Sequence, residues 1–297
     1  MTSSASPGRR VLLASASAGG TIAAVRHSCR KRIRRSRPLK ERLAAAAWSR
    51  GAKRSYAAPR ESETERFLMR LLEIGESDPG QFLLPTSDET AWLYAKNSEL
   101  LERYFRLYQP SILTQRRILD KKLLAAAAER AGVASLPSWD PQNIDELQAL
   151  APTLPYPILI KPRTHVHRLF NNKGTVARSA DKLLRQYELF FVQEKVREIE
   201  SPLLWDADRR ILQQFVNVGN EGVHSVTGFI DRSGEWFVTR RSRKVFQRSR
   251  PVAFATSRCR MTPRYRVLFT RSAASLVTLG CSRLNSFFRR RLGGDRF

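Results

Sequence analysis

The chain has 297 residues, of which 42% are hydrophobic and 27% charged, as in a soluble globular protein that can bury the core of one large or two medium-sized α/β domains. No apolar run reaches the roughly 18 residues of a membrane-spanning helix, and the three cysteines are far apart, which excludes a disulfide framework and a zinc motif and indicates a reducing, cytoplasmic setting. The net charge of +26 resides in the two ends, because residues 1–60 carry +14, residues 240–297 carry +15 and residues 61–239 carry −3, so the charge does not indicate a nucleic-acid-binding domain.

The N-terminal part of the sequence predicts a first strand followed by a glycine-rich turn. Arg10–Ala14 is an apolar run, and Gly19 and Gly20 follow it at the start of a helix of small residues. Such a turn can approach a phosphate, but it lacks a complete GxGxxG pattern, and a plain tight turn is the simpler interpretation. Residues 26–42 are very basic and show no apolar periodicity, so we expect an irregular insert there.

Residues 61–150 alternate helices with a short strand. Apolar residues at helical spacing predict a helix at Glu61–Ile74, and a turn then leads to a strand at Gln81–Leu84. Pro85–Glu89 ends that strand and caps the next helix. This order indicates an open, parallel α/β sheet. Further helices are predicted at Asn97–Leu107, Leu113–Gly132 and Asn143–Leu150, with a loop at Pro137–Pro141.

Residues 155–247 predict a second half that is richer in strands. The segments Val223–Ile230 and Glu235–Arg240 flank the turn sequence Asp-Arg-Ser-Gly, which predicts a hairpin. Residues 248–297 are basic and poorly patterned, and a shift of reading frame in the gene is one hypothesis for this break. The other elements predicted here are strands at Pro155–Lys161, Thr175–Arg178 and Arg210–Asn217, and a helix at Ser179–Leu189.

Two lysines in the middle section of the chain can meet a phosphate. Lys161 ends an apolar strand, where the sheet supports its stem and its ammonium is aimed into a cleft. Lys121 opens an alanine-rich helix forty positions earlier and offers a second cationic site. The polar loop 164–174 ends in Lys173 and Gly174, and its backbone N–H groups can close over phosphates.

These motifs together resemble one known family. The segments DKK–LLAAAAERAGV–LP, YPILIKP, NNKG–TVARS, ILQQFVNVGNEG and VTGFIDRSGEWFVTRRSRKVFQ follow one another as in the ATP-grasp superfamily, and most resemble carboxylate–amine ligases related to carbamoyl-phosphate synthase and D-aspartate ligase. The resemblance implies an α/β and α+β fold, in which a Rossmann-like pre-ATP-grasp domain precedes a two-lobed ATP-grasp domain that is incomplete at the C-terminus. It places these domains at 1–110 and 111–247, with a basic tail at 248–297.

The resemblance also implies roles for individual residues. It makes Lys121 and Lys161 the phosphate-contacting residues and puts Lys173 and Gly174 in a mobile phosphate loop. The strand residues Gln213, Gln214, Phe215 and Val216 correspond to the hinge that meets adenine, and Glu221 falls near the ribose-binding acid. Arg241 and Lys244 correspond to residues that bind an acidic substrate or stabilise the transferring phosphoryl group.

The activity implied by the resemblance is ATP-dependent ligation of a carboxylate and an amine, both of unknown identity, through an acylphosphate. Mg²⁺ accompanies ATP in the family, but its acidic ligands follow the hairpin there, whereas the only acid beyond Glu235 in this sequence is Asp295. An inactive ligase, or a non-catalytic nucleotide-binding module, is therefore an open alternative. A second alternative is a nucleic-acid-binding protein that uses its basic ends, which steeply salt-dependent DNA binding would reveal.

Overall fold

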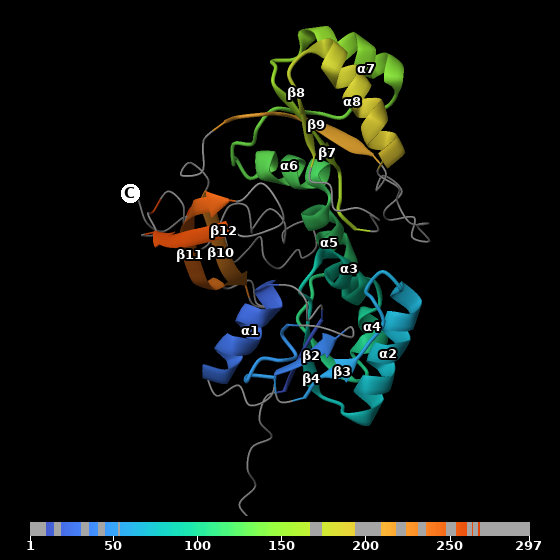
Figure 1. Ribbon diagram of the computed structural model, residues 1–297, viewed down its shortest axis with the longest axis vertical. Coiled ribbons are helices and arrows are strands. Elements are labelled where there is room, and N and C mark those ends of the chain that lie inside the picture. The colour runs from blue at the N-terminus through green and yellow to red at the C-terminus, as the bar shows by residue number, and fades with distance from the viewer. Residues whose placement is uncertain are drawn as a thin grey trace, which may run out of the picture. The chain divides into compact units, whose positions relative to one another are not determined.

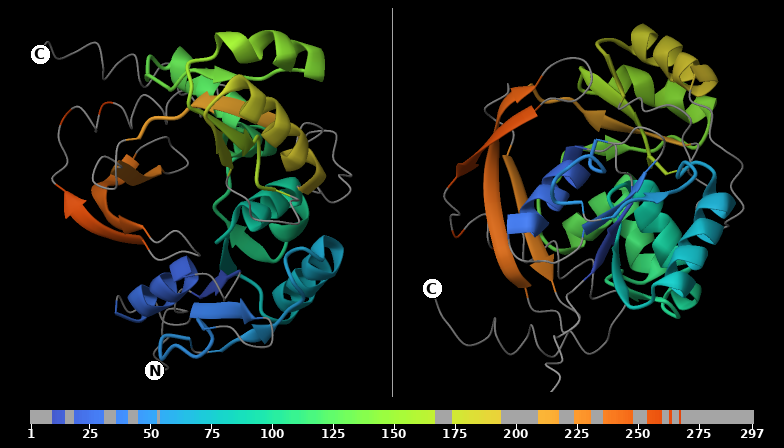
Figure 2. Two further views of the ribbon diagram at one scale, coloured as in Figure 1. Left: turned by 45° about the horizontal axis from the view of Figure 1, so that its top comes forward. Right: turned by 60° about the horizontal axis from the view of Figure 1, so that its bottom comes forward.

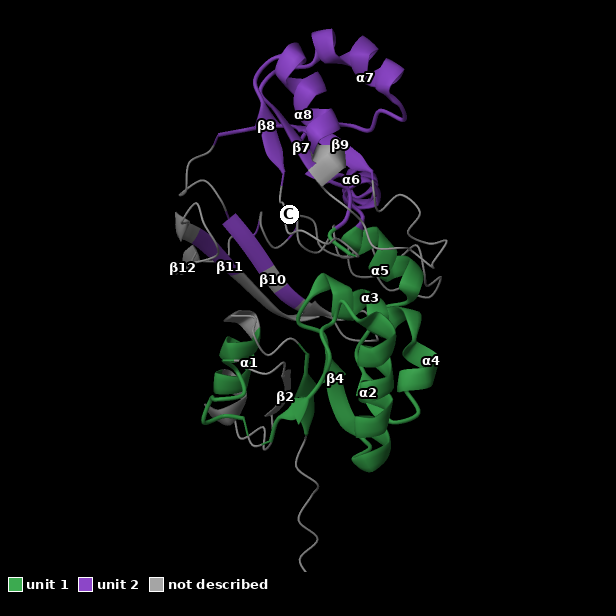
Figure 3. Cartoon of the chain, turned by 45° about the vertical axis from the view of Figure 1, so that its right-hand side comes forward, with its two compact units in different colours: residues 1–119, 165–168, 197–200 green, residues 120–164, 169–196, 201–297 purple. Residues whose placement is uncertain are grey.

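The computed structural model describes most of the chain, in two compact units (Figure 3). One unit comprises residues 1–119, 165–168 and 197–200, and the other comprises residues 120–164, 169–196 and 201–297. None of the described helices is long and apolar enough to cross a membrane. The domain boundaries expected at 110 and 247 stay predictions. The described residues are 10–14, 19–30, 36–40, 45–52, 54–166, 174–193, 209–217, 224–230, 236–247, 254–259, 263 and 267.

The first unit is built on a parallel sheet with strand order β3-β2-β1-β4-β5. All four neighbouring pairs are parallel, and the chain builds outward from β1 on one side before it crosses to β4 on the other. This is the doubly wound arrangement of Rossmann-like domains, which confirms the fold expected for the N-terminal part. The strands are β1 (Val11–Leu13), β2 (Ser36–Lys40), β3 (Tyr56–Ala57), β4 (Gln81–Leu84) and β5 (Phe105–Leu107).

Helices cover both faces of this sheet because side chains alternate along each strand. Leu12 of β1 packs in the same core as Phe67 of α2 (Thr64–Ser77), whereas its neighbours Val11 and Leu13 pack with Val25 of α1 (Gly19–Arg30). Figure 2 shows α1 and α2 on opposite sides of the strands. The described part of this unit also contains the helices α3 (Asp88–Lys96), α4 (Ser98–Leu101) and α5 (Ile112–Leu119).

The second unit contains a four-stranded antiparallel sheet of order β6-β9-β7-β8. The helices α7 (Ile144–Leu150) and α8 (Ala180–Gln193) lie together against it (Figure 1), and they pack Leu147 and Leu183 on Ile160. The helix α6 (Lys121–Arg130) opens the unit, and a 3-10 turn (Ala151–Thr153) follows α7. The strands are β6 (Ser138–Trp139), β7 (Ile158–Pro162), β8 (Thr175–Ala177) and β9 (Arg210–Gln214).

A second antiparallel sheet of the same unit has the order β10-β11-β12 (orange in Figure 1). Its first two strands, β10 (His224–Ile230) and β11 (Trp236–Gln247), form the predicted hairpin. The third strand, β12 (Phe254–Cys259), pairs with β11 and lies in the basic tail, where no strand is predicted. The mixture of a parallel and two antiparallel sheets confirms the predicted α/β and α+β class.

The structure corrects four predicted elements. Residues 105–107 form a strand rather than the end of a helix, and residues 113–132 form two helices that separate at Asp120. The loop predicted at 137–141 contains β6, which pairs with β9. The segment 26–42 is not irregular throughout, since α1 continues to Arg30 and β2 pairs with β1.

Candidate functional site

Lys161 and Gln213 meet on the face of the β6-β9-β7-β8 sheet that is turned away from α7 and α8. Ile158 and Ile160 of β7 are buried against those helices, so Leu159 and Lys161 lie on the opposite face. The Lys161 ammonium donates a hydrogen bond of 2.7 Å from Nζ to Oε1 of Gln213. Nε2 of Gln213 in turn donates to Oγ of Ser138 at 3.2 Å. The predicted phosphate residue and the predicted adenine strand are thus direct neighbours.

The environment of Lys161 is unusual for a cation. Its side chain is half-buried, and this burial lowers the pKa of the ammonium because desolvation penalises the charged form. Among the described residues its hydrogen-bond partner is a neutral amide, and no carboxylate pairs with it. A cation that has lost water and gained no anionic partner is well placed to bind an anionic ligand.

Gly174 allows the start of β8 to approach Lys161 closely. Its φ of +131° is one that side-chain-bearing residues rarely adopt. A Cβ atom at this position would lie 2.5 Å from the carbonyl oxygen of Ile160 and 3.1 Å from Cβ of Lys161. The end of the predicted phosphate loop is therefore packed directly on the strand that carries Lys161. Lys173, the other residue predicted there, lies outside the described residues.

The N-terminus of α6 is fixed to the end of the same strand. Asp120 is the N-cap of α6 and accepts hydrogen bonds from the backbone N–H groups of Lys122 (2.9 Å) and Leu123 (3.1 Å). The backbone N–H of Lys121 donates to the carbonyl oxygen of Arg163 at 3.0 Å, and its Nζ lies 3.4 Å from the same oxygen. Arg163 follows Lys161 by two residues, so the two predicted phosphate-binding lysines belong to one local structure.

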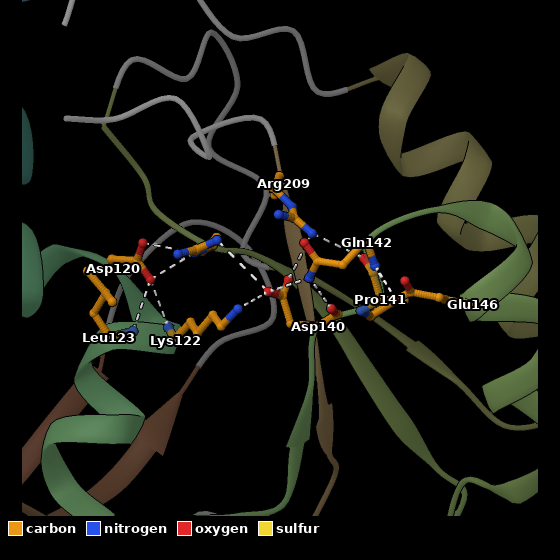
Figure 4. Close-up of polar contacts among 9 residues, drawn as sticks. Asp120, Lys122, Leu123, Asp140, Pro141, Gln142, Glu146 and Arg209 are labelled. Atoms are coloured by element: carbon orange, nitrogen blue, oxygen red, sulfur yellow. Dashed lines mark hydrogen bonds and ion pairs between the residues drawn. The ribbon is translucent and has the colours of Figure 1, made fainter. Parts of the chain in front are cut away.

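A network of charged side chains surrounds this junction (Figure 4). The guanidinium of Arg163 contacts both carboxylate oxygens of Asp120, with Nε–O distances of 2.8 and 2.9 Å, and both side chains are almost fully buried. Asp140 accepts a 2.6 Å hydrogen bond from Nζ of Lys122 and lies 3.7 Å from a guanidinium nitrogen of Arg209. Burial alone would raise the pKa of Asp140. The hydrogen bond from Lys122 and the charge of Arg209 lower this pKa by more than burial raises it, so the net shift is downward.

A cleft of about 690 Å³ lies beside this network, between α6 and the segment 132–140. Small residues of α6 and the carboxylate of Asp140 line it, and it reaches Ile211, the cross-strand neighbour of Lys161. The sequence predicts no role for Asp140 or Arg209. Asp140 lies in a segment predicted as a loop, and Arg209 lies 69 residues further along the chain, so no local spacing links them.

The remaining predicted residues lie at the end of β9, on β11, or outside the described residues. Gln214 is the last residue of β9 and Phe215 follows it, and their backbone N–H groups donate to the carbonyl oxygens of Pro137 and Pro157 at 3.0 Å each. Val216 comes next, with 45% of its surface exposed. Arg241 lies on β11, with a guanidinium nitrogen 3.4 Å from Nδ1 of His224, which must act as the acceptor because a guanidinium only donates.

Lys244 also lies on β11, whereas Glu221 is outside the described residues. Among the residues that the structure describes, no three His, Cys, Asp or Glu side chains come together as a metal site. The carboxylates of Asp120 and Asp140 are held by the basic side chains of Arg163 and Lys122.

No known protein-family profile and no curated protein matches this chain. Solved structures do. An ADP complex of N5-carboxyaminoimidazole ribonucleotide synthetase matches 93% of this chain and 65% of its own length, at 17% identity and a TM-score of 0.62. The biotin carboxylase domain of 2-oxoglutarate carboxylase from Hydrogenobacter thermophilus, with MgADP, matches 90% of this chain and 58% of its own, at 17% identity and a TM-score of 0.64.

An L-amino acid ligase from Bacillus licheniformis matches 92% of this chain and 61% of its own length, at 11% identity and a TM-score of 0.60. This chain therefore spans less than two thirds of each of these three structures. At such identities the likeness shows the fold alone. The chain has the ATP-grasp fold, which the order of its motifs predicts.

Proposed function

We propose that this chain binds ATP and acts as an ATP-dependent carboxylate–amine ligase, in which ATP phosphorylates a carboxylate and an amine displaces the phosphate. The observation that carries the proposal is the Lys161 ammonium, which is half-buried on an ATP-grasp sheet and meets a neutral amide rather than a carboxylate among the described residues. A nucleotide phosphate would supply the missing negative charge.

The proposed roles follow from the positions of the residues. Lys121 and Lys161 contact the phosphates of one nucleotide. Their segments lie together because Arg163, just after Lys161, contacts Lys121 and the preceding Asp120. The strand β9, which contains Gln213 and Gln214, lies beside the strand that carries Lys161, and together with Phe215 and Val216 it faces adenine. Gly174 closes the loop that covers the phosphates, together with Lys173. Arg241 and Lys244 bind the acidic substrate or the transferring phosphoryl group, and Glu221 binds the ribose.

A nucleotide-binding module without ligase activity is the second candidate. It is favoured by the sequence beyond Glu235, which offers Asp295 as its single acidic residue, whereas Mg²⁺ bound to ATP requires oxygen ligands. The two candidates share the nucleotide site and differ in whether adding a carboxylate and an amine together accelerates ATP hydrolysis. Nucleotide binding is therefore the first property to test.

Calorimetry with ATP, with and without Mg²⁺, tests the proposed site. We expect Lys161→Met to weaken ATP binding about tenfold to a hundredfold, because a hydrogen bond to a charged group contributes about 1.5–3 kcal/mol. Lys182→Met, which removes an exposed lysine of α8 in the same unit, is the matched control and should leave the affinity unchanged. Equal affinities of the parent chain and Lys161→Met would place the nucleotide elsewhere, and no binding by the parent chain would refute the proposal.

A further inference from the structure

The ion pair between Asp120 and Arg163 joins the two segments that carry the proposed phosphate-binding lysines. Asp120 directly precedes Lys121, and Arg163 follows Lys161 by two residues. Only 8% of the Asp120 side chain and 4% of the Arg163 side chain are exposed. Neither group is therefore placed to meet a ligand from solvent, and both contribute through what they hold.

The carboxylate of Asp120 accepts hydrogen bonds from two separate parts of the chain. Within α6 it accepts the backbone N–H groups of Lys122 and Leu123, which fixes the first turn of the helix. Across the chain its Oδ1 accepts a hydrogen bond from Nε of Arg163, and its Oδ2 lies at ion-pair distance from the same nitrogen. The orientation of the first turn of α6 is thereby tied to the guanidinium of Arg163.

The backbone of Arg163 completes the connection. Its carbonyl oxygen accepts the N–H of Lys121, and its own N–H donates to the carbonyl oxygen of Arg209, both at 3.0 Å. Lys121 is thus held by a backbone hydrogen bond to Arg163 and by the cap residue that precedes it. These two contacts restrict the movement of the Lys121 Cα atom relative to β7.

We infer that Asp120 and Arg163 form a positioning pair, which sets the place of Lys121 relative to Lys161 so that both ammonium groups meet the phosphates of one nucleotide. This inference rests on the proposed function. Positioning makes a specific demand, because the pair should matter for the β- and γ-phosphates that ATP has and AMP lacks, and not for the part that the two nucleotides share. A pair that only stabilises the fold would affect all nucleotides equally.

The test compares the affinities for ATP and AMP in the parent chain and in Asp120→Asn, by calorimetry. Asparagine is nearly as good an N-cap as aspartate, so the helix start is kept while the charge that holds Arg163 is lost. We expect ATP affinity to fall about tenfold, the effect of weakening one hydrogen bond to a charged group, with AMP affinity changed less than about twofold. Asp145→Asn makes the same change in the exposed first turn of α7 and should alter neither affinity.

A second variant, Arg163→Lys, keeps a cation beside Asp120 but loses the planar fork, and it should show the same selective loss. If Asp120→Asn does not fold, Arg163→Lys tests the inference by the same criterion, the ratio of the ATP and AMP affinities. An unchanged ATP-to-AMP affinity ratio in a folded variant would overturn the inference, whether the affinities stay the same or fall together. Failure of the parent chain to bind ATP would overturn the proposed function itself, before any variant is compared.

Discussion

At the scale of single residues, the chemistry of the site centres on Lys161 and its lowered pKa. The sequence shows a lysine at the end of an apolar strand, which is enough to predict that the sheet supports its stem. It does not show that Gln213, 52 residues later, is the hydrogen-bond partner. The pairing of β7 with β9 brings the two together, and such register is a long-range property of the fold.

The lowered pKa of Lys161 has a predictable sign in both folding and binding. Because the unfolded chain holds this proton up to the ordinary value of 10.5, the folded state binds fewer protons between its lowered pKa and 10.5, and stability rises with pH across that window. An ATP phosphate would favour the charged ammonium and raise the pKa again. We therefore expect ATP binding to take up protons within this window and to weaken as pH rises through it.

Proton uptake can be measured by calorimetry in two buffers that differ in ionisation enthalpy. Lys161→Arg is the matched variant, because an arginine keeps the positive charge but does not titrate in this range. It should bind ATP without uptake of a proton. Equal proton uptake by Lys161→Arg and the parent chain would mean that another group titrates on binding.

At the scale of elements, the sequence predicts most helices and strands. It does not predict the positions at which a contact between distant charged residues ends one helix and starts the next. Residues 113–132 contain no proline and only a terminal glycine, so local pattern predicts one helix. The chain breaks at Asp120 because its carboxylate caps α6 and is held by Arg163, 43 positions later. β5 was missed for another reason, since the alternation Phe105-Arg106-Leu107 is too short to distinguish from a helix end.

Gly174 yields a prediction at the same scale. Gly174→Ala must place a Cβ at a φ of +131° and 2.5 Å from the Ile160 carbonyl, so β8 must move away from β7 near Lys161. We expect a loss of about 2–4 kcal/mol in the free energy of unfolding, from backbone strain and overpacking together. ATP affinity should fall as well, because the strand that carries Lys161 is disturbed.

Gly80→Ala is the control for the strain alone. Its φ is also positive, at +82°, but the nearest atom to a new Cβ is the end of the Arg10 side chain at 4.0 Å. It should cost only about 1–2 kcal/mol, measured by denaturant unfolding, and should not change ATP binding. A Gly174→Ala variant as stable as Gly80→Ala, with parental ATP affinity, would show that the close approach at β7 is not required.

At the scale of the whole molecule, the described residues of each unit form hydrophobic cores of their own. The larger core of the first unit gathers Leu12, Phe67 and Leu71, and the core of the second unit gathers Ile160, Leu183 and Leu212. The doubly wound first unit could be predicted from the order of its elements, and the ATP-grasp fold of the second from the order of its motifs. The sequence does not show which residues of the basic ends belong to the sheets. The strands β2 and β12 have no apolar pattern of their own and are held by pairing with β1 and β11.

The separate cores of the two units predict two distinguishable unfolding transitions. Leu183→Ala and Leu71→Ala each empty a fully buried position in one unit, and each should cost its own unit about 2–5 kcal/mol. In scanning calorimetry the two substitutions should lower different transitions. ATP at a hundred times its Kd should add about 2.7 kcal/mol to the transition that Leu183→Ala lowers, because Lys161 and Gln213 belong to the same unit as Leu183. A single transition lowered equally by both substitutions would mean that the units unfold as one, and an ATP-induced rise confined to the Leu71-sensitive transition would place the nucleotide in the first unit.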